Sequence, residues 1–394
     1  MENLLYYIWF AEAMGPGNRK AALLLSEEEN PYRIYAMSSE QLAKAFSVEL
    51  SRQELWALSR KDTSRAAYYL EFCRRKRVDI LHYHHPAYPD KLKQLYNPPV
   101  VLYCYGQLPN VDEQLTIAMV GSRTATAYGM TLTEKLSREL ARYGVVVVSG
   151  LARGIDTMAS RGALVGEGKN IAVLGSGINV PYPKENRELM RAICRAGGAV
   201  ITEYPPDSKP EAWHFPQRNR IISGLSDGVV VTEAHSKSGA LITADLALQQ
   251  GKEVFAVPGG AQSSTHAGCN RLIQSGTAKL VTSTSDILEE YSGRLQISHK
   301  KWETEPSCDP IPEQEPSVQP GSADAVTSQP AEEAERDWTV RQREICHLLA
   351  KGTMQLDQLA QQVDYPVGEL IACLTELELE GCVEQMPGRR FCLK

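Results

Sequence analysis

The chain has 394 residues, 43% of them hydrophobic, which is enough for two or three globular domains, and no early apolar stretch is long enough for a signal peptide or membrane span. The nine cysteines are scattered without a C-x-x-C pair, which argues against a disulfide framework and a cysteine-rich zinc site. Without a signal peptide or membrane span, we expect a cytoplasmic protein. The net charge is −6, but residues 302–337 carry −9 from ten acids and one arginine, so the other parts of the chain total +3.

Helical patterns fill residues 3–78 and predict an N-terminal helical domain over residues 1–78. The stretch AEAMGPGNRKAALLL has a G-P-G turn at residues 15–17 followed by an amphipathic helix, so it resembles a helix-hairpin-helix or SAM-like unit. Turns of this kind donate backbone amides to a DNA phosphate, but a glycine turn is also a common connection between helices. Both interpretations stay open here, and the simple connection is preferred.

A segment rich in proline and aromatic residues, HYHHPAYPDKLKQLYNPPVVLYCYG, separates this domain from a different architecture. Its three histidines, His82, His84 and His85, have no carboxylate or cysteine nearby at ligand spacing, so we expect no metal site there. The aromatic side chains are expected to pack against the sheet that follows.

From Thr116 the chain alternates short apolar runs with helix-length connections. The runs TIAMVG, VVVVSG, IAVLGSG, AVITEYP, GVVVTEA and EVFAVPG each precede a loop of small residues. Strands separated in this way predict a mostly parallel sheet with helices on both faces. We therefore predict an α/β fold, with a Rossmann-like doubly wound domain that occupies residues 79–292 and includes the segment rich in proline and aromatic residues.

The loops after these strands gather at one edge of such a sheet, where ligands usually bind. The first loop, GSRTATAYG, supplies Gly121, Ser122 and Arg123. These residues combine a tight turn, hydrogen-bond donors and a fixed cation, which suits a phosphate. The loop lacks the G-x-G-x-x-G dinucleotide fingerprint, so we expect no dinucleotide cofactor.

Later loops repeat this combination of small residues and a cation. Each loop alone also fits the ordinary needs of a strand-to-helix connection, but their convergence predicts an edge that binds several phosphates. The residues concerned are Gly150 and Arg153 in SGLARGID, Lys184 and Asn186 in GSGINVPYPKEN, and Lys237, Ser238 and Gly239 in EAHSKSGALITA.

The segment HFPQRNRIISGLS places two arginines and an asparagine ahead of the fifth strand. As a helix from about Pro216, it has Arg218, Asn219 and Arg220 in its first turns, where the helix dipole disfavours cations unless an anion is bound. Phe215 either offers a ring on which a base stacks, as in single-strand binders, or anchors the loop by packing.

An enzyme is the main alternative. Rossmann-like phosphoribohydrolases, which cleave nucleoside monophosphates, also contain a P-G-G turn, and this turn occurs here at residues 258–260. In that class the turn leads into a G-T pair and a catalytic acid, whereas GGAQSSTHAG follows here. We expect no enzymatic activity, because no pair of acid–base candidates lies at a catalytic spacing. The candidates are Asp156, Glu203, Asp227, Glu233, His214 and His235.

Residues 293–337 are acidic and rich in proline, so we expect a disordered linker. Beyond it, residues 338–394 predict three helices and a wing, a winged-helix-like domain. Phosphates would repel the acidic third helix, so we expect a module that contacts protein, despite Arg389 and Arg390 in the wing. The acids of that helix are Glu369, Glu376, Glu378 and Glu380.

Several motifs together resemble the DNA-processing protein A (Smf) family: GSR, SGLARGID, YPKEN, TEYPP, FPQRNRIISGLSDGVVVTEA, SGALITA, VFAVPG and NRLIQSG. The resemblance covers about residues 80–290, with looser likeness at both ends. It implies a homodimer that binds and protects incoming single-stranded DNA without cutting it. It also implies loading of the RecA recombinase in natural transformation, with single-strand-binding protein as a further candidate partner.

We therefore predict a non-catalytic recombination mediator without metal, cofactor or membrane partner. Alanine at Arg123 or Arg218 is expected to weaken single-strand binding and to leave the fold intact. The resemblance carries DNA binding to Ser122, Arg123, Lys184, Asn186, Phe215, Arg218, Asn219 and Arg220. The loop pattern adds Gly121, Gly150, Arg153, Ser238, Gly239 and Thr243.

Overall fold

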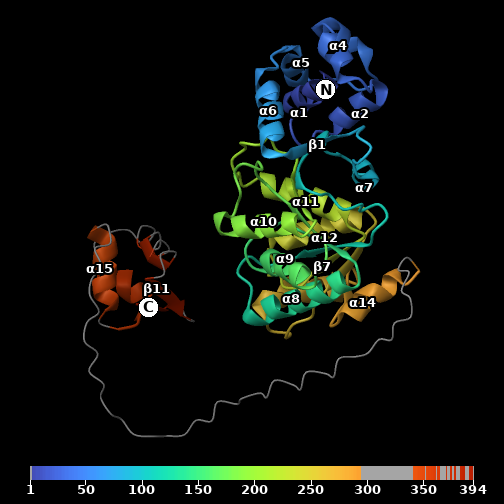
Figure 1. The fold of residues 1–394 in the computed structure, drawn as a ribbon. Helices are drawn as coiled ribbons and strands as arrows, with labels where there is room; N and C mark the ends of the chain where they lie inside the picture. Colours follow the sequence, from blue (N-terminus) through green and yellow to red (C-terminus); the bar gives the residue numbers. More distant parts are fainter. Residues whose placement is uncertain are drawn as a thin grey trace, which may run out of the picture. The chain divides into compact units, whose positions relative to one another are not determined.

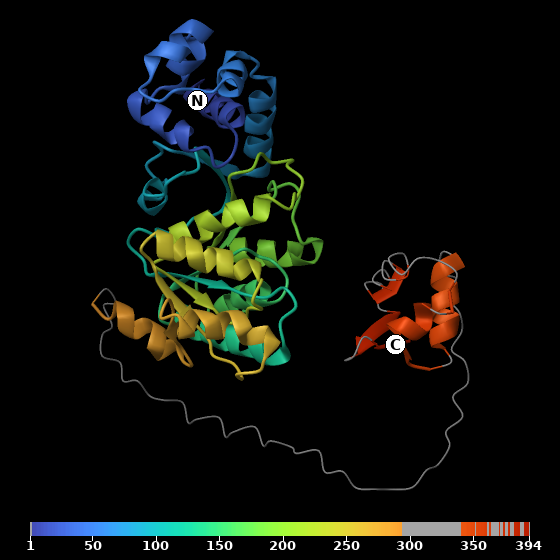
Figure 2. The same cartoon turned by 180° about the vertical axis from the view of Figure 1, so that it is seen from behind.

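The computed structural model of the chain describes residues 2–293 and, farther along, residues 340–350, 352–360, 362–363, 370, 373–374, 377–378, 382–386 and 390–393. The chain divides into two compact units, Met1–Trp302 and Glu303–Lys394, each with its own hydrophobic core. The first unit consists of a helical part joined to a part built around a sheet (Figures 1 and 2). The predicted linker lies outside the described residues, apart from Gly293.

Six helices form the helical part. Their starts follow local capping signals: Asn18 and Asn30 accept hydrogen bonds from backbone amides, and Ser38 and Ser51 form capping boxes. The first helix packs against four of the others and fully buries Phe10. The helices are α1 (Glu2–Met14), α2 (Arg19–Glu27), α3 (Pro31–Ala36), α4 (Ser39–Ala45), α5 (Arg52–Ser59) and α6 (Ser64–Lys76).

A nine-stranded sheet forms the centre of the first unit and confirms the predicted mostly parallel, Rossmann-like α/β fold. The strand order is β1-β2-β6-β5-β4-β3-β7-β8-β9, and all neighbours from β6 to β9 pair in parallel. The predicted strands are β3 (Thr116–Val120), β4 (Val146–Ser149), β5 (Asn170–Val173), β6 (Ala199–Thr202), β7 (Gly228–Val231) and β8 (Glu253–Ala256), and β9 (Lys279–Leu280) adds an edge.

Two strands that the sequence pattern did not reveal extend the sheet beyond β6. β1 (Val78–His82) pairs antiparallel with β2 (Val101–Gly106), and β2 pairs antiparallel with β6. Ile80 and Tyr103 of these strands belong to the core of the helical part, so the two strands fasten that part to the sheet. Between them Tyr88 packs into the sheet's core, as expected for this aromatic segment, ahead of α7 (Asp90–Lys93).

Helices cover both faces of the sheet. One face carries α8, α9, α10 and α14, and the other carries α11, α12 and α13. Because the parallel strands run in one direction, the loops after β3, β4 and β7 meet at one edge, beside the first turns of α11 and α12. The bounds are α8 (Ala127–Arg142), α9 (Ile155–Val165), α10 (Arg187–Arg195), α11 (His214–Leu225), α12 (Gly239–Gln249), α13 (Ala267–Gln274) and α14 (Thr284–Leu288).

The second unit has two described helices and a three-stranded antiparallel sheet of order β10-β12-β11. Of the predicted acidic helix, Leu374 and Leu377 are buried and Glu378 is exposed, whereas Glu369, Glu376, Glu380 and Arg389 lie outside the described residues. Across both units, every helix that the structure describes is too short or too polar to cross a bilayer. The elements are α15 (Val340–Leu349), β10 (Met354–Gln355), α16 (Leu356–Ala360), β11 (Val383–Met386) and β12 (Arg390–Leu393).

Candidate nucleic-acid interface

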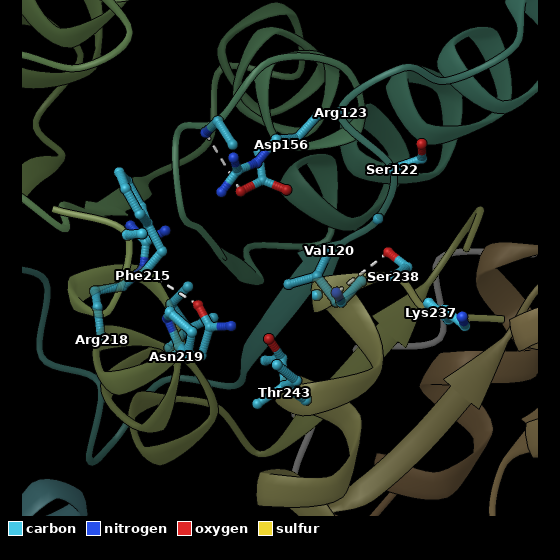
Figure 3. A pocket seen from close by; sticks show the side chains of 18 of the residues that line it. Val120, Ser122, Arg123, Asp156, Phe215, Arg218, Asn219, Lys237, Ser238 and Thr243 are labelled. Atoms are coloured by element: carbon cyan, nitrogen blue, oxygen red, sulfur yellow. Dashed lines mark hydrogen bonds between the residues drawn. The ribbon is translucent and has the colours of Figure 1, made fainter. Parts of the chain in front are cut away.

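A pocket of about 750 Å³ lies at the carboxyl ends of β3 and β7. Its side chains come from separate loops and from the first turns of α11 and α12, as Figure 3 shows. We call it the strand-end pocket. Nine of the fourteen predicted interface residues line it: Gly121, Ser122, Arg123, Phe215, Arg218, Asn219, Ser238, Gly239 and Thr243.

Arg123 and Phe215 form a cationic and aromatic wall of the pocket. The guanidinium carbon of Arg123 lies 5.1 Å from the centre of the Phe215 ring, a cation–π distance. Gly175 supports this ring from behind, because a Cβ there would lie 2.9 Å from a ring carbon. The Arg123 side chain is exposed, so its N–H donors are accessible to a phosphate.

Tyr182 is a pocket residue that sequence reasoning missed. Its ring centre lies 5.5 Å from that of Phe215, and the residue is 41% exposed. Two rings therefore stand together at one side of the pocket, where a base could stack. The sequence shows only that Tyr182 lies two residues before Lys184 in the same loop, because its exposure beside Phe215 depends on the fold.

Arg218 lies at the buried side of the pocket and is only 3% exposed. Its Nη1 donates to the backbone oxygens of Gly150 and Val173. Burial lowers the pKa of Arg218 to about 10, so the side chain still carries its charge at neutral pH. Arg218 therefore adds positive charge to the pocket while also tying α11 to the ends of two strands.

Asp156 also lines the pocket and partly balances this charge. Its carboxylate accepts hydrogen bonds from the amides of Gly150 at 2.9 Å and Ala152 at 3.4 Å. Burial raises the pKa of Asp156, and the nearby Arg218 charge opposes that rise. The carboxylate thus holds the loop after β4 in place.

The loops that open α8 and α12 supply small polar groups. Ser122 accepts from the amide of Thr124 at 3.2 Å, and Ser238 caps α12 by accepting from the amide of Ala240 at 3.3 Å. A Cβ on Gly239 would meet nothing within 4 Å, so the start of α12 is open to a ligand. The partial positive charge of a helix N-terminus at this place favours an anion.

Five other predicted residues do not line the pocket: Gly150, Arg153, Lys184, Asn186 and Arg220. The amide of Gly150 donates to Asp156, and its carbonyl accepts from Arg218, so both of its backbone groups already have partners. Arg153 forms an exposed ion pair with Glu185, and Lys184 is exposed in the short 3₁₀ helix Lys184–Asn186.

Asn186 requires a correction. It is 5% exposed, and its Nδ2 donates to the backbone oxygen of Leu151 at 3.0 Å and to Thr157 Oγ1 at 2.8 Å. Its amide group therefore fixes the loop after β4 and is not placed to contact DNA.

Arg220 also requires a correction, because it points away from the strand-end pocket into the seam with the helical part. Its two Nη atoms each lie 2.6 Å from a carboxylate oxygen of Glu203, and both side chains are buried. Its Nε donates to the backbone oxygen of Asn97 at 3.0 Å. Burial opposes the charge, but Glu203 more than compensates and raises the pKa of Arg220. Arg220 is a structural residue.

The G-P-G turn of the helical part docks on this ion pair. The amide of Gly17 donates to Glu203 Oε2 at 3.2 Å, and its carbonyl accepts from Asn97 Nδ2 at 3.1 Å. Gln217 Nε2 donates to the carbonyl of Pro16 at 2.6 Å. The Gly17 amide that could have met a DNA phosphate is thus committed to Glu203, which favours the interpretation of the turn as a connection.

Most candidates for acid–base catalysis have structural roles. Asp227 pairs with Lys91 at 2.8 Å, Glu233 accepts from the amide and hydroxyl of Thr126, and Glu203 pairs with Arg220. His214 contacts the carbonyl of Gly175, which leaves Asp156 and His235 at the pocket. In the described part of the chain, no cluster of His, Cys, Asp or Glu is arranged to hold a metal ion.

Comparison with known proteins identifies two matching families. Residues 79–292 match the family described as DNA recombination-mediator protein A, and residues 329–389 match the DprA winged helix domain. The predicted winged-helix-like domain is thereby confirmed. Protein Smf of Synechocystis is 36% identical over 82% of this chain and 82% of its own length. The DNA processing protein DprA of Bacillus subtilis is 45% identical over 52% of this chain and 69% of its own length.

Two solved structures are similar to the first unit's fold. DNA processing protein A of Streptococcus pneumoniae superposes with a TM-score of 0.63 at 35% identity, over 73% of this chain and 97% of that chain. DNA processing protein A of Helicobacter pylori, which was studied for its single-stranded DNA binding mode, gives a TM-score of 0.50 at 30% identity, over 56% of this chain and 97% of that chain.

Proposed function

The chain belongs to the DNA recombination-mediator protein A family, and from this premise we propose that it binds single-stranded DNA in the strand-end pocket. The observation that carries the proposal is the exposed guanidinium of Arg123 above the ring of Phe215. A phosphate pairs with the cation and a base stacks on a ring, which are the two components of single-strand binding without sequence preference.

The remaining groups of the pocket support the same ligand. The open start of α12 at Gly239 and the exposed Lys237 favour a second phosphate. Phe215 and Tyr182 offer ring faces, which every base can use. Contacts to backbone and ring faces carry little sequence information, so we infer binding that is selective for single strands and tolerant of sequence.

We further propose that the protein acts through a partner. Asp156 holds the loop after β4 in place, and His235 contacts the carbonyl of Ser264 at 3.0 Å, so we infer that the protein binds strands without cutting them. As the family resemblance implies, this role is to protect incoming DNA in natural transformation and to load the RecA recombinase onto it, past single-strand-binding protein. Homodimerisation would place two bound strands side by side by symmetry.

Fluorescence anisotropy with matched single- and double-stranded oligonucleotides tests the binding. The wild type is expected to prefer the single strand, and Phe215→Ala to weaken binding by about 1–3 kcal/mol, the usual contribution of a stacked base. Trp56→Ala is the matched control, since Arg60 lies over the Trp56 ring at 5.0 Å in the helical part. Equal losses in both variants, or none in Phe215→Ala, would contradict the proposed site.

RecA filament formation on oligonucleotides precoated with single-strand-binding protein tests the partner role. We expect faster nucleation with the wild type than with Arg123→Ala. Equal nucleation rates would contradict the role in loading RecA and would leave a protein that only coats and protects DNA.

Turnover of a nucleoside monophosphate tests the enzyme alternative. We expect none above a control without protein. If turnover is observed and Asp156→Asn abolishes it, the protein would instead be a phosphoribohydrolase.

A further inference from the structure

A second basic surface lies along α10, outside the strand-end pocket. Arg187, Arg191 and Arg195 follow one another at intervals of four residues, so they share one face of the helix and span ~12 Å at 1.5 Å per residue. All three are exposed. The last turn of α6 and its cap add Arg74, Arg75, Lys76 and Arg77, also exposed.

Two hollows lie between the C-terminal end of α6 and α10, whose residues line them. The larger hollow, about 540 Å³, is lined by Arg77, Arg191 and Arg195. The smaller, about 190 Å³, is lined by Lys76, Arg187 and again Arg191. Cations from the end of α6 and from α10 therefore border two neighbouring hollows, which we treat together as one depression.

This depression adjoins the strand-end pocket through one loop. Pro181 lines the smaller hollow, and the next residue, Tyr182, lines the strand-end pocket. Tyr105 and Arg191 line both hollows. A chain that leaves the pocket past Tyr182 thus meets Arg187, then Arg191, then Arg195. We call this path the α10 track.

Arg77 shows that a long cation is kept where the backbone disfavours it. It caps α6 in the left-handed conformation, with φ 54° and ψ 47°. Glycine adopts this conformation without penalty, whereas other residues pay about 1–2 kcal/mol. The side chain of Arg77 lines the larger hollow, which gives a reason for an arginine at this position.

Acidic neighbours only weakly compete for these cations. Glu188 pairs with Arg191, and Glu71 lies 3.7 Å from Arg75. The side chains of both acids are more than half exposed, and exposed pairs contribute little, so a phosphate can replace them.

We propose that a single strand bound in the strand-end pocket continues along the α10 track, where Arg187, Arg191 and Arg195 pair with its phosphates. The proposal rests on the proposed function and extends its site. The occupant follows from the charge of the track and from its continuity with a pocket suited to phosphate and base.

Oligonucleotides of two lengths separate the track from the pocket. A strand of about 3 nucleotides is short enough to stay within the pocket of about 750 Å³, whereas one of about 20 nucleotides reaches beyond it. The triple variant Arg187→Ala/Arg191→Ala/Arg195→Ala is expected to bind the short strand as the wild type does. It should bind the long strand at least tenfold more weakly, with a shallower dependence of log affinity on log salt, by about 0.7 for each lost contact.

The matched control is Arg142→Ala/Arg161→Ala/Lys169→Ala, which removes the same charge from exposed positions on and near α8 and α9. This control should bind both strands as the wild type does.

The track is overturned if the triple variant and its control bind the long strand equally well. Failure of the proposed function has a different signature, because Arg123→Ala would then leave the binding of the short strand unchanged.

Discussion

The two sides of α11 use the same residue type for opposite purposes. Arg218 and Arg220 are two residues apart, so their side chains leave the helix in nearly opposite directions. Arg218 borders the strand-end pocket, whereas Arg220 enters the seam with the helical part. Charged side chains at the start of a helix therefore identify a ligand site only when the direction of each side chain is known.

The two arginines also differ in how their charge is compensated. Arg220 meets a carboxylate through both Nη atoms and a carbonyl through Nε. Arg218 meets two carbonyl oxygens and has Asp156 as a near neighbour without a direct ion pair of the same kind. The charge of Arg220 is thus neutralised by an ion pair within the protein. The charge of Arg218 is not paired in this way, so it can still attract a bound anion.

Breaking the seam should have the largest effect on stability. Arg220→Ala leaves Glu203 buried without its partner, which is expected to cost about 3–5 kcal/mol of unfolding free energy. Urea denaturation measures the loss. The double variant Arg220→Met/Glu203→Leu should recover most of it, because an apolar pair needs no compensation. A loss below about 1 kcal/mol in Arg220→Ala would show that water compensates Glu203.

Arg218→Ala should affect both sides of the comparison at once. The sequence predicted an intact fold, but the structure shows two buried carbonyls that lose their donor. We expect a loss of about 1–3 kcal/mol in unfolding free energy, together with weaker single-strand binding. Denaturation and anisotropy on the same preparation check this. Unchanged stability would mean that solvent reaches the oxygens of Gly150 and Val173.

Acidification should destabilise the packing of β1 against the helical part. His82 stacks on Tyr7 with ring centres 4.0 Å apart, and burial lowers the pKa of His82 from 6.5 to about 4. Between these values the unfolded chain binds more protons than the folded one, so stability falls as the pH falls through this window. Thermal melts at pH 7 and pH 5 should show a smaller decrease for His82→Phe than for the wild type. Identical decreases in the two proteins would show that His82 does not cause the loss of stability at low pH.

Removing the C-terminal module should have the smallest effect. Deletion of residues 338–394 is expected to change single-strand affinity by less than about threefold, under ~1 kcal/mol. The acidic third helix predicted there is poorly suited to phosphate. A loss of tenfold or more in anisotropy would show that the wing arginines reach DNA.

The sheet was predictable because its strands are buried on both faces and therefore read as continuous apolar runs. The loops after β3 and β7 were predictable for a similar reason, since parallel strands bring them to one edge. β1 and β2 were not, because their residues are spread through a segment dominated by proline and aromatics. Their antiparallel pairing depends on contacts with the helical part, which no local pattern encodes.

The errors in the site have a common physical origin. Arg220 and Asn186 lie in motifs that also supply pocket residues, and a motif does not state which members turn inward. Their partners, Glu203 and Thr157, lie 17 and 29 residues away in sequence. Tyr182 was missed for the converse reason, because its exposure beside Phe215 appears only when two distant loops fold together.

The salt dependence of single-strand binding by Arg123→Ala is the sharpest test of whether the strand-end pocket binds DNA. We expect lower affinity and a slope of log affinity against log salt that is shallower by about 0.7, the value for one lost phosphate contact. The double variant Arg220→Met/Glu203→Leu, which changes charge only on the seam side of α11, should keep the wild-type slope. An unchanged slope and affinity in Arg123→Ala, measured on folded protein, would contradict the assignment of the strand-end pocket to DNA.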